Sequence, residues 1–164
     1  MSERLELRGW PQKPMPTGTR RLPREELARR EDALRRVPLF RDLPKRHLRS
    51  IARVTAVSSV RQGDVMVKED TPGTVFFVIQ EGRAKVVRRG RTIARLSRGE
   101  FFGEISLLDG GPRTASVVAE EPISCLTLAG HDFRQILARE PPLALAILKE
   151  VAGRLRDKGV SPVG

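Results

Sequence analysis

The residues best suited to bind a ligand lie in one segment, FFGEISLLDGGPRTASV, at residues 101–117. Gly103 lets the backbone approach a ligand closely. Residues 104–108 can form one helical turn whose free N–H groups point toward an anion. Arg113 adds a planar fork of donors that fits a phosphate, and the Glu104 carboxylate can accept a hydrogen bond from a ribose hydroxyl. The segment therefore predicts a pocket for a sugar phosphate.

Each of these side chains also has a purely structural interpretation. Arg113 could be one more surface arginine, since the chain has 31 Lys and Arg residues. Glu104 could cap the short helical turn, and Thr114 could simply favour the start of a strand. The grouping of Gly103, Glu104 and Arg113 in one segment favours the ligand-binding interpretation.

The rest of the sequence offers no obvious catalytic or metal-binding set. Cys125 is the single cysteine, which fits a reducing compartment, and its apolar neighbours predict a buried side chain. His47 and His131 have no partner at ligand spacing, so no metal site is expected. Because no paired carboxylates or Ser/His/Asp set can be assembled, we expect a binding protein without cofactors and not an enzyme.

Charge and hydropathy bound the partners and the compartment. The formal net charge of +11 would attract an anion such as nucleic acid, an acidic membrane or a phosphate ligand. The basic residues are spread along the chain, which favours solubility as their role, so nucleic acid is not expected as a partner. No apolar signal segment or membrane-length run is present, so we expect a cytoplasmic protein without a membrane span.

Helices are predicted at 23–53, after a basic tail at 1–22 that lacks periodicity and is expected to be flexible. The first, PREELARREDALRRV, has acids in its first turn and arginines in its last, and its thin apolar face predicts packing at the domain edge. Pro38-Leu39-Phe40 breaks this helix. A second helix, KRHLRSIARV, should turn three apolar side chains inward, namely Leu48, Ile51 and Ala52.

After residue 54 the hydrophobic period changes from 3.6 to 2, which predicts strands. The expected strands cover 54–60, 64–69, 75–80, 84–89, 92–97, 114–119 and 123–128. Five glycines lie between or at the ends of these strands, where a positive φ is expected: Gly63, Gly73, Gly82, Gly90 and Gly99. This spacing predicts an antiparallel, jelly-roll-like β-roll at 54–130.

A C-terminal helix pair is predicted at 131–157, followed by a tail at 158–164. The longer helix has an apolar stripe at helical spacing, which comprises Ala144, Ile147, Leu148, Val151 and Leu155. The stripe could pack on the roll or form the seam of a homodimer, and the sequence leaves both open. The predicted fold class is α+β, an antiparallel β-roll flanked by N-terminal helices and a C-terminal helix pair.

Two ordered signatures resemble those of the cyclic-nucleotide-binding domain family, which includes catabolite activator proteins, kinase regulatory subunits and cyclic-nucleotide-gated channels. Its phosphate-binding cassette is matched at 102–117 by Phe102-Gly103-Glu104-Ile105-Ser106-Leu107 and Arg113-Thr114-Ala115-Ser116-Val117. Its second signature is matched by Met66-Val67, Thr71-Pro72-Gly73, Phe76-Phe77-Val78-Ile79 and Gly82. Asp70 stands where the family usually has glycine, a small departure because aspartate tolerates the left-handed conformation. The resemblance covers about residues 37–157.

The resemblance implies a role for each cassette residue. Glu104 would hold the ribose 2′-hydroxyl and Arg113 the cyclic phosphate. Backbone amides near Ser106 and around Thr114-Ala115 would complete the phosphate cradle, flanked by Phe102, Gly103 and Ile105 of the cassette. Val86 and Ala94, on a hairpin, would line the base side. Thr114 fits either nucleotide, and similarity to bacterial members favours cAMP over cGMP.

The implied function is a cyclic-nucleotide sensor, a regulatory module for signal transduction that acts allosterically on an unknown effector protein. The helices at 131–157 would move on binding, and the basic tail with the first helix would contact the partner. The chain ends before a helix-turn-helix could fit behind the roll, so a stand-alone module is expected. The alternative is a degenerate roll that binds no nucleotide and serves as a protein-interaction scaffold.

Overall fold

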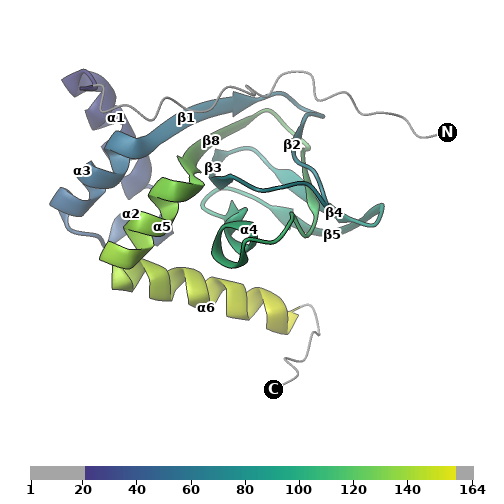
Figure 1. The fold of residues 1–164 in the computed structure, drawn as a ribbon. Coiled ribbons are helices and arrows are strands. Elements are labelled where there is room, and N and C mark those ends of the chain that lie inside the picture. Colours follow the sequence, from purple (N-terminus) through teal and green to yellow (C-terminus); the bar gives the residue numbers. More distant parts are fainter. Residues whose placement is uncertain (1–20, 158–164) are drawn as a thin grey trace.

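The computed structural model describes residues 21–157, which form a β-roll with helices gathered at one end of it (Figure 1). The predicted tails at 1–22 and 158–164 lie almost wholly outside these residues. The helices are α1 (Arg24–Arg35), α2 (Pro38–Arg41), α3 (Lys45–Val54), α4 (Glu104–Asp109), α5 (Gly130–Arg139) and α6 (Pro141–Asp157). The strands are β1 (Thr55–Val60), β2 (Val65–Val67), β3 (Val75–Glu81), β4 (Ala84–Arg88), β5 (Arg91–Leu96), β6 (Phe101–Phe102), β7 (Ser116–Ala119) and β8 (Ile123–Ala129).

The strands form two four-stranded sheets, in the orders β1-β8-β3-β6 and β2-β7-β4-β5. Every pairing between neighbouring strands is antiparallel. Neighbours such as β1 and β8 are far apart in sequence, so the chain winds back and forth between the two sheets as a roll requires. The predicted α+β fold with an antiparallel β-roll is confirmed.

Strand β3 divides the core into two halves because both of its faces are buried. Phe76 and Val78 belong to a cluster shared with the helices, whereas Phe77 and Ile79 point into the roll. Alternation along a strand sends successive side chains to opposite faces. Both faces need apolar side chains, so β3 has the continuous apolar run VFFVI.

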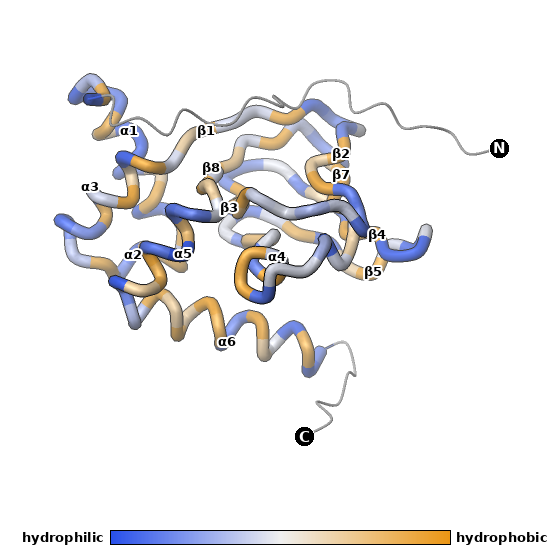
Figure 2. Tube along the Cα trace, viewed as in Figure 1, coloured by the Kyte–Doolittle hydropathy of each residue, from blue (hydrophilic) through white to orange (hydrophobic). Residues whose placement is uncertain are grey.

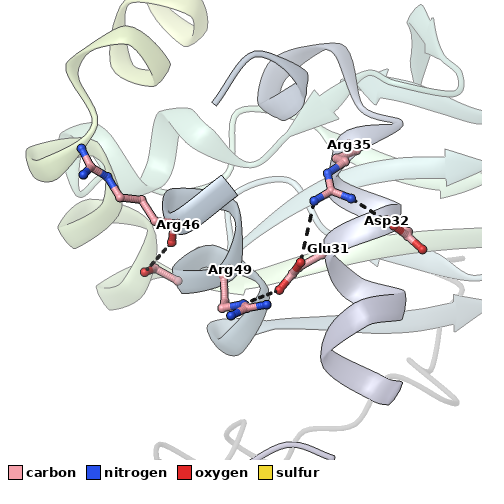
Figure 3. A network of polar contacts seen from close by, with 6 residues as sticks. Glu31, Asp32, Arg35, Arg46 and Arg49 are labelled. Atoms are coloured by element: carbon pink, nitrogen blue, oxygen red, sulfur yellow. Dashed lines mark hydrogen bonds and ion pairs between the residues drawn. The ribbon is translucent and has the colours of Figure 1, made fainter. Parts of the chain in front are cut away.

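The N-terminal helices contribute more to the core than their sequence indicated. Leu34 and Val37 are fully buried, so the first helix does not merely cover the domain edge. The inward positions predicted for α3 are confirmed. Figure 3 shows the polar contact that joins the two helices: the buried Glu31 carboxylate accepts from Arg49 Nε at 2.9 Å and lies 3.9 Å from Arg35.

Three local predictions need correction. Pro38 ends α1 but also begins the one-turn helix α2, because proline suits the first helical position. Gly73 does not have a positive φ, unlike the other four predicted turn glycines. On α6 the predicted stripe is split. Leu143, Ile147 and Val151, spaced four apart, face the core, whereas Leu148 and Leu155 are 64% and 45% exposed.

Cys125 behaves as its apolar surroundings predicted. Its side chain is fully buried in the roll, and burial raises the pKa of the thiol to about 12. A thiol with such a pKa is protonated at neutral pH and is a poor nucleophile. Cys125 therefore acts as a small core side chain.

Candidate functional site

The predicted sugar-phosphate segment folds into a compact corner between the two sheets. Strand β6 ends at Gly103, whose φ of 91° turns the chain into the short helix α4. Glu104 opens this helix and is 3% exposed, while Arg113, beyond the following loop, is 6% exposed. Two oppositely charged side chains are thus buried close together, and the field of Glu104 acts on the pKa of Arg113. Burial of this kind requires partners for both charges.

Backbone carbonyl groups hold the Arg113 guanidinium in place. Its Nη1 donates to the Gly103 carbonyl at 2.9 Å, and its Nη2 donates to the Val75 carbonyl at 2.7 Å. A guanidinium has five N–H donors. Within the described part of the chain these two bonds use two of them, which leaves three for an anion. Burial lowers the pKa of Arg113, opposed by the nearby Glu104 carboxylate. The result is a rigid cationic fork whose position is set by the backbone.

The two sequence signatures, about 40 residues apart in the chain, meet at Arg113. The Asp70 amide donates to the Arg113 carbonyl at 2.9 Å, and the Arg113 amide donates to the Thr71 carbonyl at 2.8 Å. An isolated bridge between Pro72 and Pro112 continues the pairing. Asp70 has a φ of 63°, as expected for a residue in place of a turn glycine. The second signature therefore fixes the backbone on which the arginine stands.

Two glycines make room for the guanidinium. A Cβ atom on Gly73 would lie 2.6 Å from Arg113 Nε and 2.7 Å from Ser106 Cβ. On Gly103 it would lie 2.7 Å from Arg113 Nη1 and 2.8 Å from the Val75 carbonyl oxygen. Atoms cannot approach so closely, so any side chain at either position would displace the arginine. This packing role replaces the turn role predicted for Gly73.

Glu104 faces a second arginine that sequence reasoning missed. Arg154 of α6 places Nη1 3.3 Å from Glu104 Oε1. Burial raises the pKa of Glu104 above its ordinary value, while its backbone hydrogen bond, Arg154 and Arg113 pull that pKa back down. The carboxylate is therefore a desolvated acceptor, held between one arginine of the cassette and one arginine of the C-terminal helix.

Arg154 also binds the strand that leads into the cassette. Its Nη2 donates to the Phe101 carbonyl at 2.6 Å, and its guanidinium lies 4.7 Å from the centre of the Phe101 ring. Glu150, one turn earlier on α6, lies 3.6 Å from Arg154 Nε. The sequence offers no local sign of these contacts, because Arg154 is one arginine among many and its partners Glu104 and Phe101 lie 50 and 53 residues away.

Comparison with known proteins identifies the family. The cyclic nucleotide-binding domain matches residues 57–140, about half of the chain and the whole of the cassette. The chain belongs to the cyclic nucleotide-binding domain family. A putative potassium channel protein, RPA4233, of Rhodopseudomonas palustris is 36% identical over 123 residues, which are 73% of this chain and 30% of the channel protein.

Two further relatives show how widely this domain is used. The cGMP-dependent protein kinase, isozyme 2 forms cD5/T2, of Drosophila melanogaster is 30% identical over 136 residues, 78% of this chain and 14% of the kinase. A solved structure, cAMP-bound PfPKA-R (141-441), has the same fold with a TM-score of 0.74 and 23% identity, covering 84% of this chain and 49% of that one. The chain thus spans less than a third of the length of the channel protein and of the kinase.

The other predicted cassette residues differ in how deeply they are buried. Ser106 is buried beside Gly73, whereas Thr114 is exposed and directly follows the arginine. Ile105 is 39% exposed on α4. Phe102 is buried within the roll, where its ring stacks on Phe77 at 4.7 Å.

The predicted base-side residues come together on the hairpin of β4 and β5. Val86 and Ala94 are directly opposite each other in its register, and both are half-buried. Their role toward a nucleotide base remains a prediction.

Other site classes find no support in residues 21–157. No group of three or more His, Cys, Asp or Glu side chains there could hold a metal ion. No helix among the same residues is long and apolar enough to cross a membrane. His47, predicted not to be a ligand, instead pairs through Nδ1 with Glu140 at 2.6 Å, which ties α3 to the junction of α5 and α6.

Proposed function

We propose that this domain binds cAMP, in preference to cGMP, and transmits the binding to an effector protein through α6. One observation supports the proposal: Glu104, at the start of α4, and Arg113, beyond the following loop, are both buried. Glu104 would accept from a ribose hydroxyl, and Arg113 would donate to a cyclic phosphate. Two glycines, Gly73 and Gly103, leave space for the Arg113 guanidinium next to this carboxylate. No catalytic step is proposed, because the contacts describe recognition alone.

Each group would act through a bond that suits its charge. Arg113 would present its remaining N–H donors to the exocyclic oxygens of the cyclic phosphate, a charge-assisted contact worth about 1.5–3 kcal/mol for each bond. Glu104 would accept from the 2′-hydroxyl. Amides near Ser106 and Thr114-Ala115 would complete the cradle, with Val86 and Ala94 on the base side.

The preference for cAMP follows from Thr114. This exposed residue directly follows Arg113, and its hydroxyl would donate to the same phosphate. Used in that way, the hydroxyl gives no selective bond to a guanine amino group. The similar proteins are divided on this point, since one is named as a cGMP-dependent kinase and another as cAMP-bound.

The allosteric part of the proposal rests on Arg154. Arg154 belongs to α6 and now pairs with the Glu104 carboxylate. A ribose hydroxyl that binds Glu104 would change this pairing. Nucleotide binding would therefore change the free energy of one α6 arrangement relative to another, which is the condition for a population shift. The exposed side of α6, which carries Leu145, Leu148 and Leu155, would meet the effector or a second copy of the chain.

The ligand is tested by calorimetric titration of the wild-type chain, refolded to remove any co-purified nucleotide, with cAMP, cGMP and 5′-AMP. We expect saturable binding in the order cAMP, cGMP, 5′-AMP, because the linear nucleotide cannot present the cyclic phosphate. Tighter binding of cGMP would overturn the base preference alone. No heat with any nucleotide, together with an unchanged melting temperature, would support the scaffold alternative.

The coupling is tested with Arg154→Ala and the matched variant Arg156→Ala, which removes an exposed arginine from the same helix. Hydrogen exchange of residues 141–157 is measured with and without saturating cAMP. We expect cAMP to change exchange in the wild type and in Arg156→Ala, and to change it much less in Arg154→Ala. An equal response in all three proteins would contradict transmission through Arg154.

A further inference from the structure

The hairpin of β4 and β5 concentrates positive charge in one part of the molecule. Between Glu81 and Glu100 the sequence has seven basic residues and no acidic one. Figure 1 shows that this hairpin projects from the roll on the side away from α1, α3 and α5. Seven of the 31 Lys and Arg residues therefore lie in or beside this one projecting hairpin.

The register of the hairpin places like charges directly opposite each other. Ala84 pairs with Leu96, and both are buried, so the next pair, Lys85 and Arg95, points to the outer face. Like charges directly opposite on a sheet are destabilising. The repulsion between Lys85 and Arg95 destabilises the hairpin when no anion is present. An anion bound across the pair would remove this repulsion.

The tip of the hairpin repeats this pattern. Arg88 pairs with Arg91, on either side of Arg89 and Gly90. The nearby acid is Glu69, whose carboxylate accepts from the Arg89 backbone amide at 3.0 Å. Among the described residues, neither Arg88 nor Arg91 forms an ion pair. Figure 2 shows the tip as hydrophilic.

Two acids on the edge of β7 compensate only the base of the hairpin. Glu120 lies 3.2 Å from Arg95, and Glu121 lies 2.8 Å from Arg83. Lys85 has no acidic partner within residues 21–157. The uncompensated charge therefore increases from the base of the hairpin toward its tip.

An aliphatic side chain lies among these cations. Ile93 is 40% exposed, and it is the extra residue where the register shifts between Val86 and Val87. Along the strand Ile93 lies between Arg91 and Arg95. Stacking on single-stranded nucleic acid would need exposed aromatic rings, and every phenylalanine in the described part of the chain is buried.

We propose that the projecting part of this hairpin, comprising Lys85, Arg88, Arg89, Arg91, Ile93 and Arg95, binds the surface of an anionic lipid membrane. Guanidinium groups pair bidentately with lipid phosphates. Basic side chains near an acidic leaflet each contribute about fivefold to partitioning. Ile93 enters the boundary between headgroups and acyl chains, where apolar side chains of peripheral proteins are buried. This combination of cations with one aliphatic contact favours a lipid surface over nucleic acid.

The test is co-sedimentation of the full chain with vesicles of one part phosphatidylglycerol to two parts phosphatidylcholine, and with pure phosphatidylcholine. Three hairpin residues are replaced together, Arg88→Ala, Arg89→Ala and Arg91→Ala. The matched control removes the same charge elsewhere, through Arg24→Ala, Arg41→Ala and Arg53→Ala, all exposed residues of the N-terminal helices. A third variant, Ile93→Ser, leaves the charge unchanged.

We expect binding to the anionic vesicles only, reduced about 100-fold by the hairpin variant, much less by the control variant and severalfold by Ile93→Ser. An equal loss in both triple variants would show that the total charge is responsible and would overturn the proposal. Equal binding to neutral vesicles or no binding to anionic ones would also overturn it. Hairpin-dependent binding to duplex DNA without vesicle binding would assign the surface to nucleic acid instead.

Discussion

Two groups of arginines in this domain have the same chemistry and opposite surroundings. Arg113 is 6% exposed, and two backbone carbonyls and two glycines determine its position. The arginines at the tip of the β4–β5 hairpin are exposed and face other cations across the register. In our proposals, Arg113 binds one small anion and the hairpin arginines bind an extended anionic surface.

The difference shows how burial changes what a charge does. A buried guanidinium has already lost its water and has fixed donors, so a ligand of the right shape gains strong, short-range bonds. Exposed guanidinium groups keep their water and act mainly through a field that salt screens within about 8–10 Å. Changes near Arg113 should therefore have large effects that depend on geometry, and changes in the hairpin should have graded effects that depend on salt.

The largest effect is expected from filling the space that Gly73 leaves. In Gly73→Ala the new Cβ would lie 2.6 Å from Arg113 Nε, which displaces the fork from both carbonyls. We expect about a 100-fold loss of cAMP affinity by calorimetry, since two charge-assisted bonds are affected. Gly153→Ala is the control, because its Cβ would contact nothing within 4 Å. Unchanged affinity in Gly73→Ala would show that the position of Arg113 is not what binds the ligand.

A smaller loss of affinity for cAMP should follow when the charge of Arg113 is kept and its planar guanidinium is removed. Arg113→Lys retains a cation but cannot donate to Gly103 and Val75 while it also binds a phosphate bidentately. We expect affinity for cAMP to fall about tenfold, the loss of one such bond. Full retention of affinity would mean that this site, like the hairpin, acts by charge alone.

Glu104 offers a prediction that pairs a variant with a modified ligand. If its carboxylate holds the ribose, 2′-deoxy-cAMP should bind the wild type about tenfold more weakly than cAMP does. In Glu104→Gln the difference between the two ligands should be much smaller, because the charged acceptor is absent. Equal discrimination by both proteins, measured by competition, would remove Glu104 from the ribose contact.

The same residue should give the smallest effect, which is a pH dependence. Burial raises the pKa of Glu104, so its carboxylate takes up a proton at a higher pH than an ordinary glutamate, whose pKa is about 4.3. Protonation removes the acceptor, so affinity for cAMP should fall as the pH is lowered through that raised pKa. Glu104→Gln should have a flatter profile over the same range. Parallel profiles would assign the pH dependence to another group.

The sequence predicted the cassette well because its signal is local. Gly103, Glu104 and Arg113 lie within 11 consecutive residues, and the strands around them alternate with period 2, so spacing alone was informative. The turn at Asp70 was also correctly read, since its conformation depends on the residue itself.

Long-range packing accounts for what the sequence did not reveal. Arg154 acquires its role only when α6 crosses the end of the roll, and the role of Gly73 depends on a guanidinium 40 positions away. The sequence also left open how the apolar stripe of α6 packs, because periodicity cannot tell which of two adjoining apolar faces meets the core; Leu148 and Leu155 are exposed.

The most direct test compares the loss of cAMP affinity when one buried arginine is removed with the loss when three exposed arginines are removed. cAMP is titrated by calorimetry into the wild type, into Arg113→Ala and into the triple variant Arg88→Ala, Arg89→Ala, Arg91→Ala, at one pH and one salt concentration. We predict that the loss of Arg113 lowers affinity by at least about 100-fold, whereas the triple variant stays within about threefold of the wild type because its charges are exposed and screened. An Arg113→Ala protein that binds cAMP like the wild type, or a triple variant that loses as much affinity, would contradict the assignment of the nucleotide to the buried site.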